Sequence, residues 1–549
     1  MKWWGWGAED KEFRMEHHPY LWPFVEKWLG DVSEGVSAPP VAFDAVELPE
    51  PRVSETFAKE FPNASRDDLD RLQHTYGKSF RDLYRVRRGL AQVAPDLVVR
   101  PESAEEVERL VMVADQTGVV LIPFGGGSNV AGCVEARHTG DRTVVSVDLS
   151  ELNRVLEVDA HSLTASIQAG VYGPAMETQL GQQGVTLGHF PDSFEYSTLG
   201  GWIATRSAGM QSDKYGKIED MVVSLRMASP NGLIVTRPVP RCSNGIDVNH
   251  VCIGSEGTLG VITDAMMRVH KIPERRELYG WLFPDFESGV AGVHECTRAG
   301  CAPSITRLND KARTALSFAF RAGGKDSFFK RMVSHYLKRR FDFEKVCLLI
   351  IGHEGSERVF SRQKRDCAQI YKKHGGFCLG TAPGVAHEKG KYDFPYIRDW
   401  LMDRDVIADV SETATVWSNV LPLYRSVMAA IESAMAEHAE KGFVGCHVSH
   451  TYPTGSSLYF TFACKQDPGL GLSQYLKIKK AAEDAFLAGG ATLSHHHAVG
   501  WEHLPWMSQE CSPAGLEAIR SLKRGLDPNT IMNPGKVVPE GEVIVGWDA

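Results

Sequence analysis

Several features are rare or missing in this sequence of 549 residues, and each absence excludes a class of protein. No apolar stretch approaches the roughly 20 residues of a membrane span, and the first residues lack the long apolar segment of a secretory signal. Basic residues are not in excess, because 60 Lys and Arg face 69 Asp and Glu, so we expect no nucleic-acid partner. Internal repeats and low-complexity tracts are also missing.

The eleven cysteines are scattered singly, and no two form a Cys-x-x-Cys pair. An odd number of separate cysteines is typical of reduced thiols and not of a disulfide framework or a zinc site. We therefore predict no metal centre and a cytoplasmic location. The chain ends in Trp547-Asp548-Ala549, which is not a peroxisomal signal.

What is present is the composition of an ordinary globular protein, with 43% hydrophobic and 23% charged residues over a length that suits three or four domains. Residues 1–91 form a predicted helical N-terminal region, in which Leu69, Leu72 and Tyr76 recur at helical spacing. This region shows no catalytic constellation, and we expect it to serve packing or a dimer surface.

Beyond residue 91 the pattern changes to alternating strands and helices. Residues 96–100 form a predicted strand, the capping box at 103–106 begins a helix, and 119–123 form a buried strand. Three β-rich runs follow, at 143–149, 154–159 and 163–169. Consecutive strands without helices between them favour an α+β fold over a doubly wound α/β fold.

A second large unit begins near Pro273. It contains strand-like segments at 278–282, 346–352 and 457–463 and a helical segment at 420–438. A further cluster of polar residues starts near Ser494.

A glycine loop, Phe124-Gly125-Gly126-Gly127-Ser128-Asn129, directly follows the strand at 119–123. Successive glycines let the backbone approach a ligand closely, and their N–H groups can converge on an anionic pyrophosphate. The loop satisfies neither the dinucleotide Rossmann pattern nor the P-loop pattern. By itself, a plain tight turn explains it equally well.

Three further loops are rich in glycine and small hydroxyl residues, at 191–201, 205–209 and 254–263. Together with the glycine loop, they resemble the FAD-binding domain of the vanillyl-alcohol oxidase / p-cresol methylhydroxylase superfamily, in the same order over residues 90–270. The Asn533-Pro534-Gly535-Lys536 segment is also typical of that superfamily.

The resemblance implies a two-subdomain FAD-binding domain at 92–272 and an α/β cap domain for the substrate at 273–493. It also implies a C-terminal segment, 494–549, that carries a histidine cluster and returns to the FAD domain. Ser128 and Asn129 stand where covalent members often have a histidine, so we expect non-covalent FAD, although attachment through the cap domain stays open. The resemblance assigns the following residues to FAD binding: Pro123, Phe124, Gly125, Gly126, Gly127, Ser128, Asn129, Asp192, Ser193, Phe194, Glu195, Tyr196, Ser197, Thr198, Thr205, Arg206, Ser207, Ala208, Glu256, Gly257, Thr258, Leu259, Gly260, Val261 and Ile262.

Within this superfamily, metal-dependent D-2-hydroxy-acid dehydrogenases carry a His-x-Gly-Asp-Gly-Asn-x-His stretch. The corresponding segment here, 447–455, lacks the metal carboxylate, which disfavours that branch. Over nearly its whole length the chain instead resembles the alkyldihydroxyacetonephosphate synthases, a family of ether-lipid enzymes. The segments that carry this resemblance are 1–7, 191–198, 215–220, 301–308, 396–399, 458–460 and 494–497.

The family resemblance implies a reaction without net redox change. The acyl chain of acyl-dihydroxyacetone phosphate is exchanged for a long-chain fatty alcohol, through a bond between flavin N5 and substrate C1. An FAD-dependent dehydrogenase or oxidase of a 2-hydroxy acid or alcohol is the alternative function. The family's ending and its peroxisomal targeting have no counterpart here, which suggests a bacterial relative.

The resemblance also assigns roles to six residues. Tyr459 matches the family's acid/base tyrosine, whose ordinary pKa near 10 requires a nearby cation for activity. Arg398 matches a substrate-binding arginine, suited to an oxyanion, and Arg307 matches an activity-linked arginine for which a structural role is equally good. His495, His496 and His497 would alternate faces if they lay in a strand, so we expect one or two of them to reach the substrate, His496 first.

Basic residues at 328–331 and 338–340 flank an amphipathic stretch. A solvated helix face explains them well, and the alternative is a peripheral membrane contact, because both implied substrates are lipids. Known relatives are dimers, so we also expect a homodimer.

Overall fold

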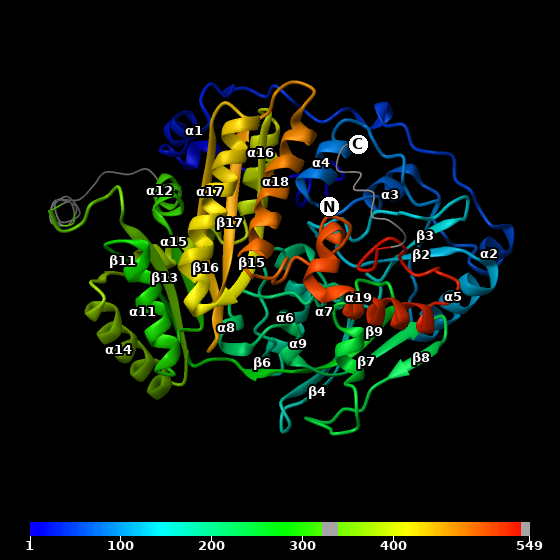
Figure 1. Ribbon diagram of the computed structural model, residues 1–549. Helices are drawn as coiled ribbons and strands as arrows, with labels where there is room; N and C mark the ends of the chain where they lie inside the picture. The colour runs from blue at the N-terminus through cyan, green and yellow to red at the C-terminus, as the bar shows by residue number, and fades with distance from the viewer. Residues whose placement is uncertain (321–336, 338, 540–549) are drawn as a thin grey trace.

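The computed structural model describes residues 1–320, 337 and 339–539 (Figure 1). Three main sheets organise this part of the chain, two in the FAD-type domain and one in the cap domain. The mixture of parallel, antiparallel and helical parts confirms the predicted α+β fold. Within the described residues, no helix is both long and apolar enough to cross a membrane.

The first sheet is a parallel sheet of three strands in the order β1-β3-β2, made of β1 (Leu97–Val99), β3 (Val144–Asp148) and β2 (Val120–Phe124). Helix α5 (Ala104–Thr117) connects β1 to β2. It begins at Ser103, whose side chain accepts a hydrogen bond from the N–H of Glu106, and it ends at Gly118 in the left-handed conformation. The glycine loop therefore leaves the sheet at the end of β2.

The second sheet is antiparallel and has five strands in the order β4-β5-β9-β7-β8. Of the three predicted β-rich runs, the first is β3 of the parallel sheet, and the other two are β4 and β5 of this sheet. Its strands are β4 (Val155–Asp159), β5 (Thr164–Gln168), β7 (Val222–Ser229), β8 (Gly232–Val235) and β9 (Val261–Arg268). The segments between them are α6 (Gly173–Gly181), β6 (Val185–Thr186), α7 (Leu199–Thr205), α8 (Ser212–Tyr215), α9 (Ile218–Met221) and α10 (Val248–Cys252), and β10 (His270–Lys271) pairs with β6.

The cap domain is built on a seven-stranded sheet in the order β14-β11-β13-β12-β16-β17-β15, on the left of Figure 1. All of its strand pairings among the described residues are antiparallel. Its strands are β11 (Arg275–Phe283), β12 (Ile305–Asn309), β13 (Cys347–Gly355), β14 (Phe377–Gly380), β15 (Val406–Val416), β16 (Gly442–Thr451) and β17 (Gly455–Lys465).

Helices cover both faces of the cap sheet. Apolar residues of α11 (Phe286–Arg298), α14 (Glu357–Lys373), α17 (Val420–His438) and α18 (Gly471–Ala488) join one face in a large core. The opposite face receives α1 (Leu21–Leu29), α12 (Lys311–Ala319), α15 (Ala382–Gly390) and α16 (Phe394–Met402). Because side chains alternate along a strand, and Leu308, Val448 and Leu458 belong to the large core, their neighbours Arg307, His447 and Tyr459 point to this second face.

The two ends of the chain close the structure. After α1, the chain continues through α2 (Glu55–Glu60), α3 (Asp68–Gln73) and α4 (Phe80–Val86). The last long helix, α19 (Met507–Leu526), leads back to the FAD-type domain, where the N–H of Leu121 donates to the carbonyl of Ile531 at 2.8 Å. Residues 328–331 and Lys338, on which a membrane contact was predicted, lie outside the described residues.

Candidate functional site

One cavity of about 350 Å³ lies between the FAD-type domain and the cap domain. The glycine loop and the small-residue loops line one side of it, which brings together segments that are far apart in the sequence. The predicted FAD-binding residues that line the cavity are Pro123, Phe124, Gly125, Gly126, Gly127, Ser128, Asn129, Asp192, Ser193, Ser197, Thr198, Thr205, Ser207, Ala208, Glu256, Gly257, Gly260 and Ile262.

The glycines of this loop are required by close packing. A Cβ at Gly126 would lie 1.9 Å from the carbonyl oxygen of Tyr196, and one at Gly125 would lie 2.4 Å from Thr198 Oγ1. Gly127 has a φ of +62°, a conformation that favours glycine. A side-chain-free loop that borders a cavity lined by hydroxyls and backbone fits an extended anionic cofactor such as FAD.

Seven residues of the predicted FAD set are not among those that line the cavity. Phe194 packs instead against Trp202 and Tyr392, while Glu195 and Tyr196 border a separate pocket near the N-terminus. Arg206 ends α7 and donates to the carbonyl of His250. The remaining three, Thr258, Leu259 and Val261, are buried, Leu259 and Val261 in the apolar core. At these positions the loop sequence continues into helix caps and core residues, and the sequence alone does not distinguish them from residues that line the cavity.

Three strands of the cap sheet place a row of polar side chains beside the cavity, and His447 and Tyr459 line it. In the pairing register, Tyr459 on β17 lies opposite Glu412 on β15 and opposite His447 on β16. Directly opposed residues point to the same face of a sheet. We call Glu412, Tyr459 and His447 the catalytic row.

The histidine segment is wrapped around the carboxylate of Glu412. Glu412 Oε1 accepts hydrogen bonds from Ser494 Oγ at 2.7 Å and from the N–H groups of His495, His496 and His497 at 3.0, 2.9 and 3.0 Å. The segment is therefore an irregular turn, so the alternation of faces that a strand would impose on the three histidines does not apply. A buried carboxylate that accepts several N–H hydrogen bonds strongly stabilises such a turn, because hydrogen bonds to an ionised acceptor are stronger than neutral ones.

This turn gives the three histidines different surroundings. His496 and His497 line the cavity, and their rings lie 5.9 and 5.5 Å from the ring of Tyr459. His495 faces away from Tyr459, because Tyr452 Oη lies 2.6 Å from its Nε2 and the ring of His450 stacks on it at 5.2 Å. Two of the three histidines can therefore reach a bound molecule.

Burial decides the protonation of this cluster. It lowers the pKa of His447, His450 and His497 well below the usual range, so these imidazoles are neutral proton acceptors at neutral pH. Burial works against ionisation of Glu412, but the surrounding histidines and hydrogen bonds outweigh it and hold its pKa well below its usual range.

Tyr459 is a proton donor in its resting state. Burial raises the pKa of this phenol above its ordinary value, and the nearby carboxylates of Asp192 and Glu412 raise it further, while Arg307 opposes the shift. The expected activating cation is thus Arg307, but it does not make Tyr459 a base by itself.

Both predicted arginines line the cavity. Arg307 comes from β12 and Arg398 from α16. Arg398 donates to the carbonyl of Lys78, and its Nε is buried without a hydrogen-bond partner among the described residues. Two guanidinium groups with unused donors fit a phosphate or a carboxylate.

Two groups in this cluster have spacings that a metal could use. The ring nitrogens of His450, His495 and His496 lie within 4.8 Å of one another, as do the ligand atoms of Glu412, His496 and His497. These atoms already form a hydrogen-bonded network, with Tyr452 on His495 and N–H groups on Glu412. The predicted lack of a metal stays a prediction.

The far end of the cavity is apolar. Its lining comes from α1, α12, α16 and the edge of the cap sheet, and we call it the apolar arm. Its members are Leu21, Phe24, Val25, Leu29, Leu316, Phe320, Phe394, Ile397, Trp400, Leu401, Ala408 and Phe443. The N-terminal region, for which we expected packing or a dimer surface, therefore also lines the cavity through α1.

Sequence analysis missed Glu412 and undervalued His447 and His450. The two histidines were visible in the segment 447–455, which was considered only as a degraded metal motif. Glu412 gave no local signal, because its partners lie more than 80 residues away in the sequence. Amphipathic spacing in α1 could have shown a buried face at Leu21, Val25 and Leu29.

Two family models match the FAD-type domain and the part of the chain that follows it. Residues 95–237 match the family model described as FAD binding domain, and residues 272–537 match the one described as FAD linked oxidases, C-terminal domain. The chain thus carries an FAD-binding domain, which confirms the predicted cofactor.

Two curated relatives and one solved structure that are similar to this chain carry the same name. The alkyldihydroxyacetonephosphate synthase of Dictyostelium discoideum is 43% identical over 97% of this chain and 85% of the relative. That of Trypanosoma brucei brucei is 38% identical over 90% and 82%. A solved structure of an alkyldihydroxyacetonephosphate synthase has a TM-score of 0.85 at 38% identity, covering 97% of this chain and 98% of the other. p-Cresol methylhydroxylase, at 13% identity and a TM-score of 0.66 over 89% and 98%, shares the fold.

Proposed function

Because the chain belongs to the alkyldihydroxyacetonephosphate synthase family, we propose that it exchanges the acyl chain of acyl-dihydroxyacetone phosphate for a long-chain fatty alcohol. The observation that carries the proposal is the cavity itself. It joins a flavin-type glycine loop, a polar cluster with two arginines and an apolar arm in one continuous space. A substrate with an anionic head and a long apolar tail matches that order.

The arginines bind the anionic groups. Arg307 and Arg398 lie where the cap domain faces the glycine loop, so one guanidinium can hold the phosphate and the other can receive the departing carboxylate. The apolar arm then holds the acyl chain and, after exchange, the alkyl chain, because burial of each methylene contributes about 0.8 kcal/mol.

Proton transfer falls to the catalytic row and the histidine turn. The neutral imidazoles of His447 and His497 can accept a proton from substrate carbon or from the alcohol, and Tyr459 can donate one to an oxygen that gains negative charge. Glu412 acts through the histidines, because its oxygens bind the N–H groups of their turn. When bound, FAD supplies the reactive ring nitrogen that lets the exchange proceed without net redox change.

A homodimer, a cytoplasmic location and a peripheral membrane contact belong to the same proposal. The lipid nature of both substrates supports the membrane contact.

The test is an anaerobic incubation of the flavin-loaded protein with palmitoyl-dihydroxyacetone phosphate and hexadecanol, without an electron acceptor. Alkyl-dihydroxyacetone phosphate, detected by mass spectrometry, is the expected product. If 2-hydroxy acids instead bleach the flavin and no ether product forms, the proposal is wrong and the protein is a dehydrogenase or oxidase.

A further inference from the structure

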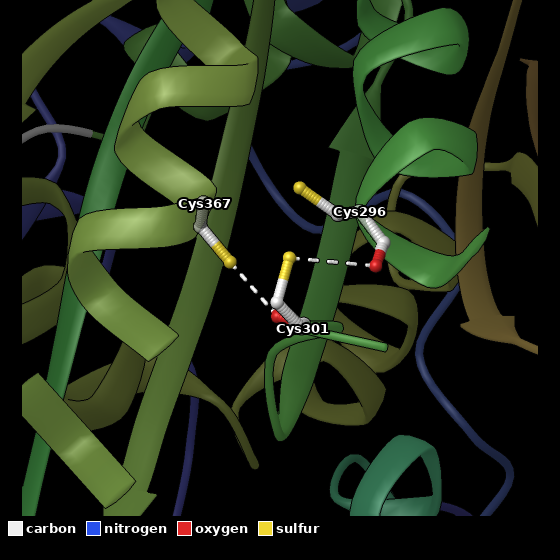
Figure 2. A group of neighbouring side chains, drawn as sticks. All are labelled: Cys296, Cys301 and Cys367. Carbon is white, nitrogen blue, oxygen red and sulfur yellow. Dashed lines mark hydrogen bonds between the residues drawn. The ribbon is translucent and has the colours of Figure 1, made fainter. Parts of the chain in front are cut away.

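Three cysteines, two of them five residues apart and the third far along the chain, meet on the face of the cap sheet that α11 and α14 cover (Figure 2). Cys296 lies near the end of α11, Cys301 lies in the loop that precedes β12, and Cys367 lies on α14. Their sulfur atoms all lie within 4.8 Å of one another, and each residue is at most 6% exposed. This thiol cluster lies apart from the cavity and has no part in the proposed reaction.

A fourth donor lies beside the cluster. Tyr371 follows Cys367 by four residues on α14, so both side chains share one face of the helix. Its hydroxyl is buried and makes no hydrogen bond of regular geometry with the described residues, and its neighbours are the thiol of Cys296, which is its side-chain contact, and the thiols of Cys367 and Cys301. Buried hydroxyls are normally paired with a strong partner, so one that has only thiols beside it calls for an explanation.

We propose that Cys296, Cys301, Cys367 and Tyr371 form a binding site for a thiophilic divalent cation, Zn²⁺. Structural zinc is held in closed four-coordinate sets, usually of four cysteines or of three cysteines and a histidine, and here the oxygen of Tyr371 would take the fourth position beside three sulfurs. With Zn–S bonds of about 2.3 Å, tetrahedral geometry places the sulfurs about 3.8 Å apart, so the thiol cluster needs to contract by about 1 Å at most.

The surroundings allow such a contraction and an entry path. Two of the thiols donate to carbonyls, Cys301 to that of Cys296 at 3.5 Å and Cys367 to that of Cys301 at 2.9 Å (Figure 2), and the three thiols otherwise contact one another. Residues 298–300, between Cys296 and Cys301, are exposed. On binding, the three thiols release three protons to the solvent and Tyr371 coordinates as the neutral phenol, so three thiolates at −3 and the ion at +2 leave a net charge of −1.

Occupancy would tie two helices to the strand that carries Arg307. Cys301 precedes Arg307 by six residues, and the loop between them has no other metal-type ligand. A bound ion would therefore stabilise α11, α14 and the start of β12 as one unit.

Co²⁺ is the probe of choice, because tetrahedral thiolate-bound Co²⁺ absorbs at wavelengths longer than those of the flavin. We expect the reduced, flavin-loaded protein to bind one Co²⁺ with these bands, and one equivalent of Zn²⁺ to remove them. Cys367→Ala should lose the bands and weaken Zn²⁺ binding at least about tenfold. Cys464→Ala, a buried cysteine of β17 outside the thiol cluster, is the matched control and should keep both.

Metal held by the active-site histidines would survive Cys367→Ala and would lack thiolate-to-cobalt charge transfer. Either that result or an absence of thiolate-bound Co²⁺ in the unmodified protein overturns the proposal. The second criterion needs no variant, so it holds even if the substituted chain fails to fold.

Discussion

Replacement of Glu412 by glutamine tests whether one buried carboxylate organises the histidine turn. The amide keeps the size of the side chain and removes its charge. Glu412 accepts from four groups of this turn, Ser494 Oγ and the N–H groups of the three histidines. The amide nitrogen of glutamine would face at least one N–H donor and could not accept from it.

The size of the effect follows from those four bonds. A hydrogen bond to a charged group is worth about 1 kcal/mol more than one to a neutral group, so the loss is at most roughly 4 kcal/mol. If half of this loss, about 2 kcal/mol, raises the activation free energy of the reaction, kcat falls about 30-fold, since each 1.36 kcal/mol is a factor of ten. KM for the acyl substrate should change little, because the arginines and the apolar arm stay in place.

The assay is steady-state alkyl transfer, with flavin content measured on each sample. Glu483→Gln is the matched control, because Glu483 is as deeply buried but lies on α18 and makes no hydrogen bond or ion pair with the histidine turn among the described residues. We expect Glu483→Gln to keep kcat. If Glu412→Gln retains flavin and also keeps the kcat of the unmodified enzyme, the reasoning about the turn is refuted.

Three further predictions concern the apolar arm, the anion site and the buried acid of α18. Val25→Trp should fill part of the apolar arm and lower kcat/KM for hexadecanol at least about tenfold relative to kcat/KM for octanol. The control Glu26→Gln, at an exposed neighbouring position, should leave kcat/KM for both alcohols unchanged, and equal losses for both alcohols in Val25→Trp would contradict the assignment of the apolar arm. Arg398→Lys should raise KM for acyl-dihydroxyacetone phosphate about tenfold, because lysine cannot bind an oxyanion with two parallel bonds, and an unchanged KM would remove Arg398 from the anion site. Burial raises the pKa of Glu483 to about 8, so the folded state keeps a proton that the unfolded state loses above the ordinary pKa of 4.5. The free energy of unfolding should therefore fall by up to about 1.4 kcal/mol per pH unit between pH 4.5 and pH 8, and Glu483→Gln should flatten the dependence of the Tm on pH. An equal slope in both proteins would show that Glu483 is ionised in the fold.

Local signals predicted the parts of the site that lie within one segment. The glycine loop, the serine cap before α5 and the helix at 420–438 were all visible in the sequence, because turn chemistry and hydrophobic period are local properties; the reciprocal half of the predicted capping box is absent, since the Glu106 carboxylate accepts from the N–H of Glu102. The arginines and Tyr459 were assigned through the family resemblance, and the structure brings them to one cavity.

The rest depends on contacts between distant segments. The pairing register that sets Glu412 opposite Tyr459 joins β15 to β17, and no periodicity within either strand predicts it. The contribution of α1 to the apolar arm arises because the N-terminal region folds onto the cap sheet. The scattered cysteines illustrate the same limit, because spacing in the sequence gave no hint that three of them meet.

The most direct test of the account is the fate of the alcohol oxygen. The flavin-loaded enzyme would be incubated with palmitoyl-dihydroxyacetone phosphate and ¹⁸O-labelled hexadecanol, with mass spectrometry of all lipid products. If the alcohol replaces the acyl group at C1, the label appears in the ether product and the released palmitate is unlabelled. Label in a wax ester would mean that the alcohol attacks the acyl carbonyl instead, which would contradict the proposed exchange at C1.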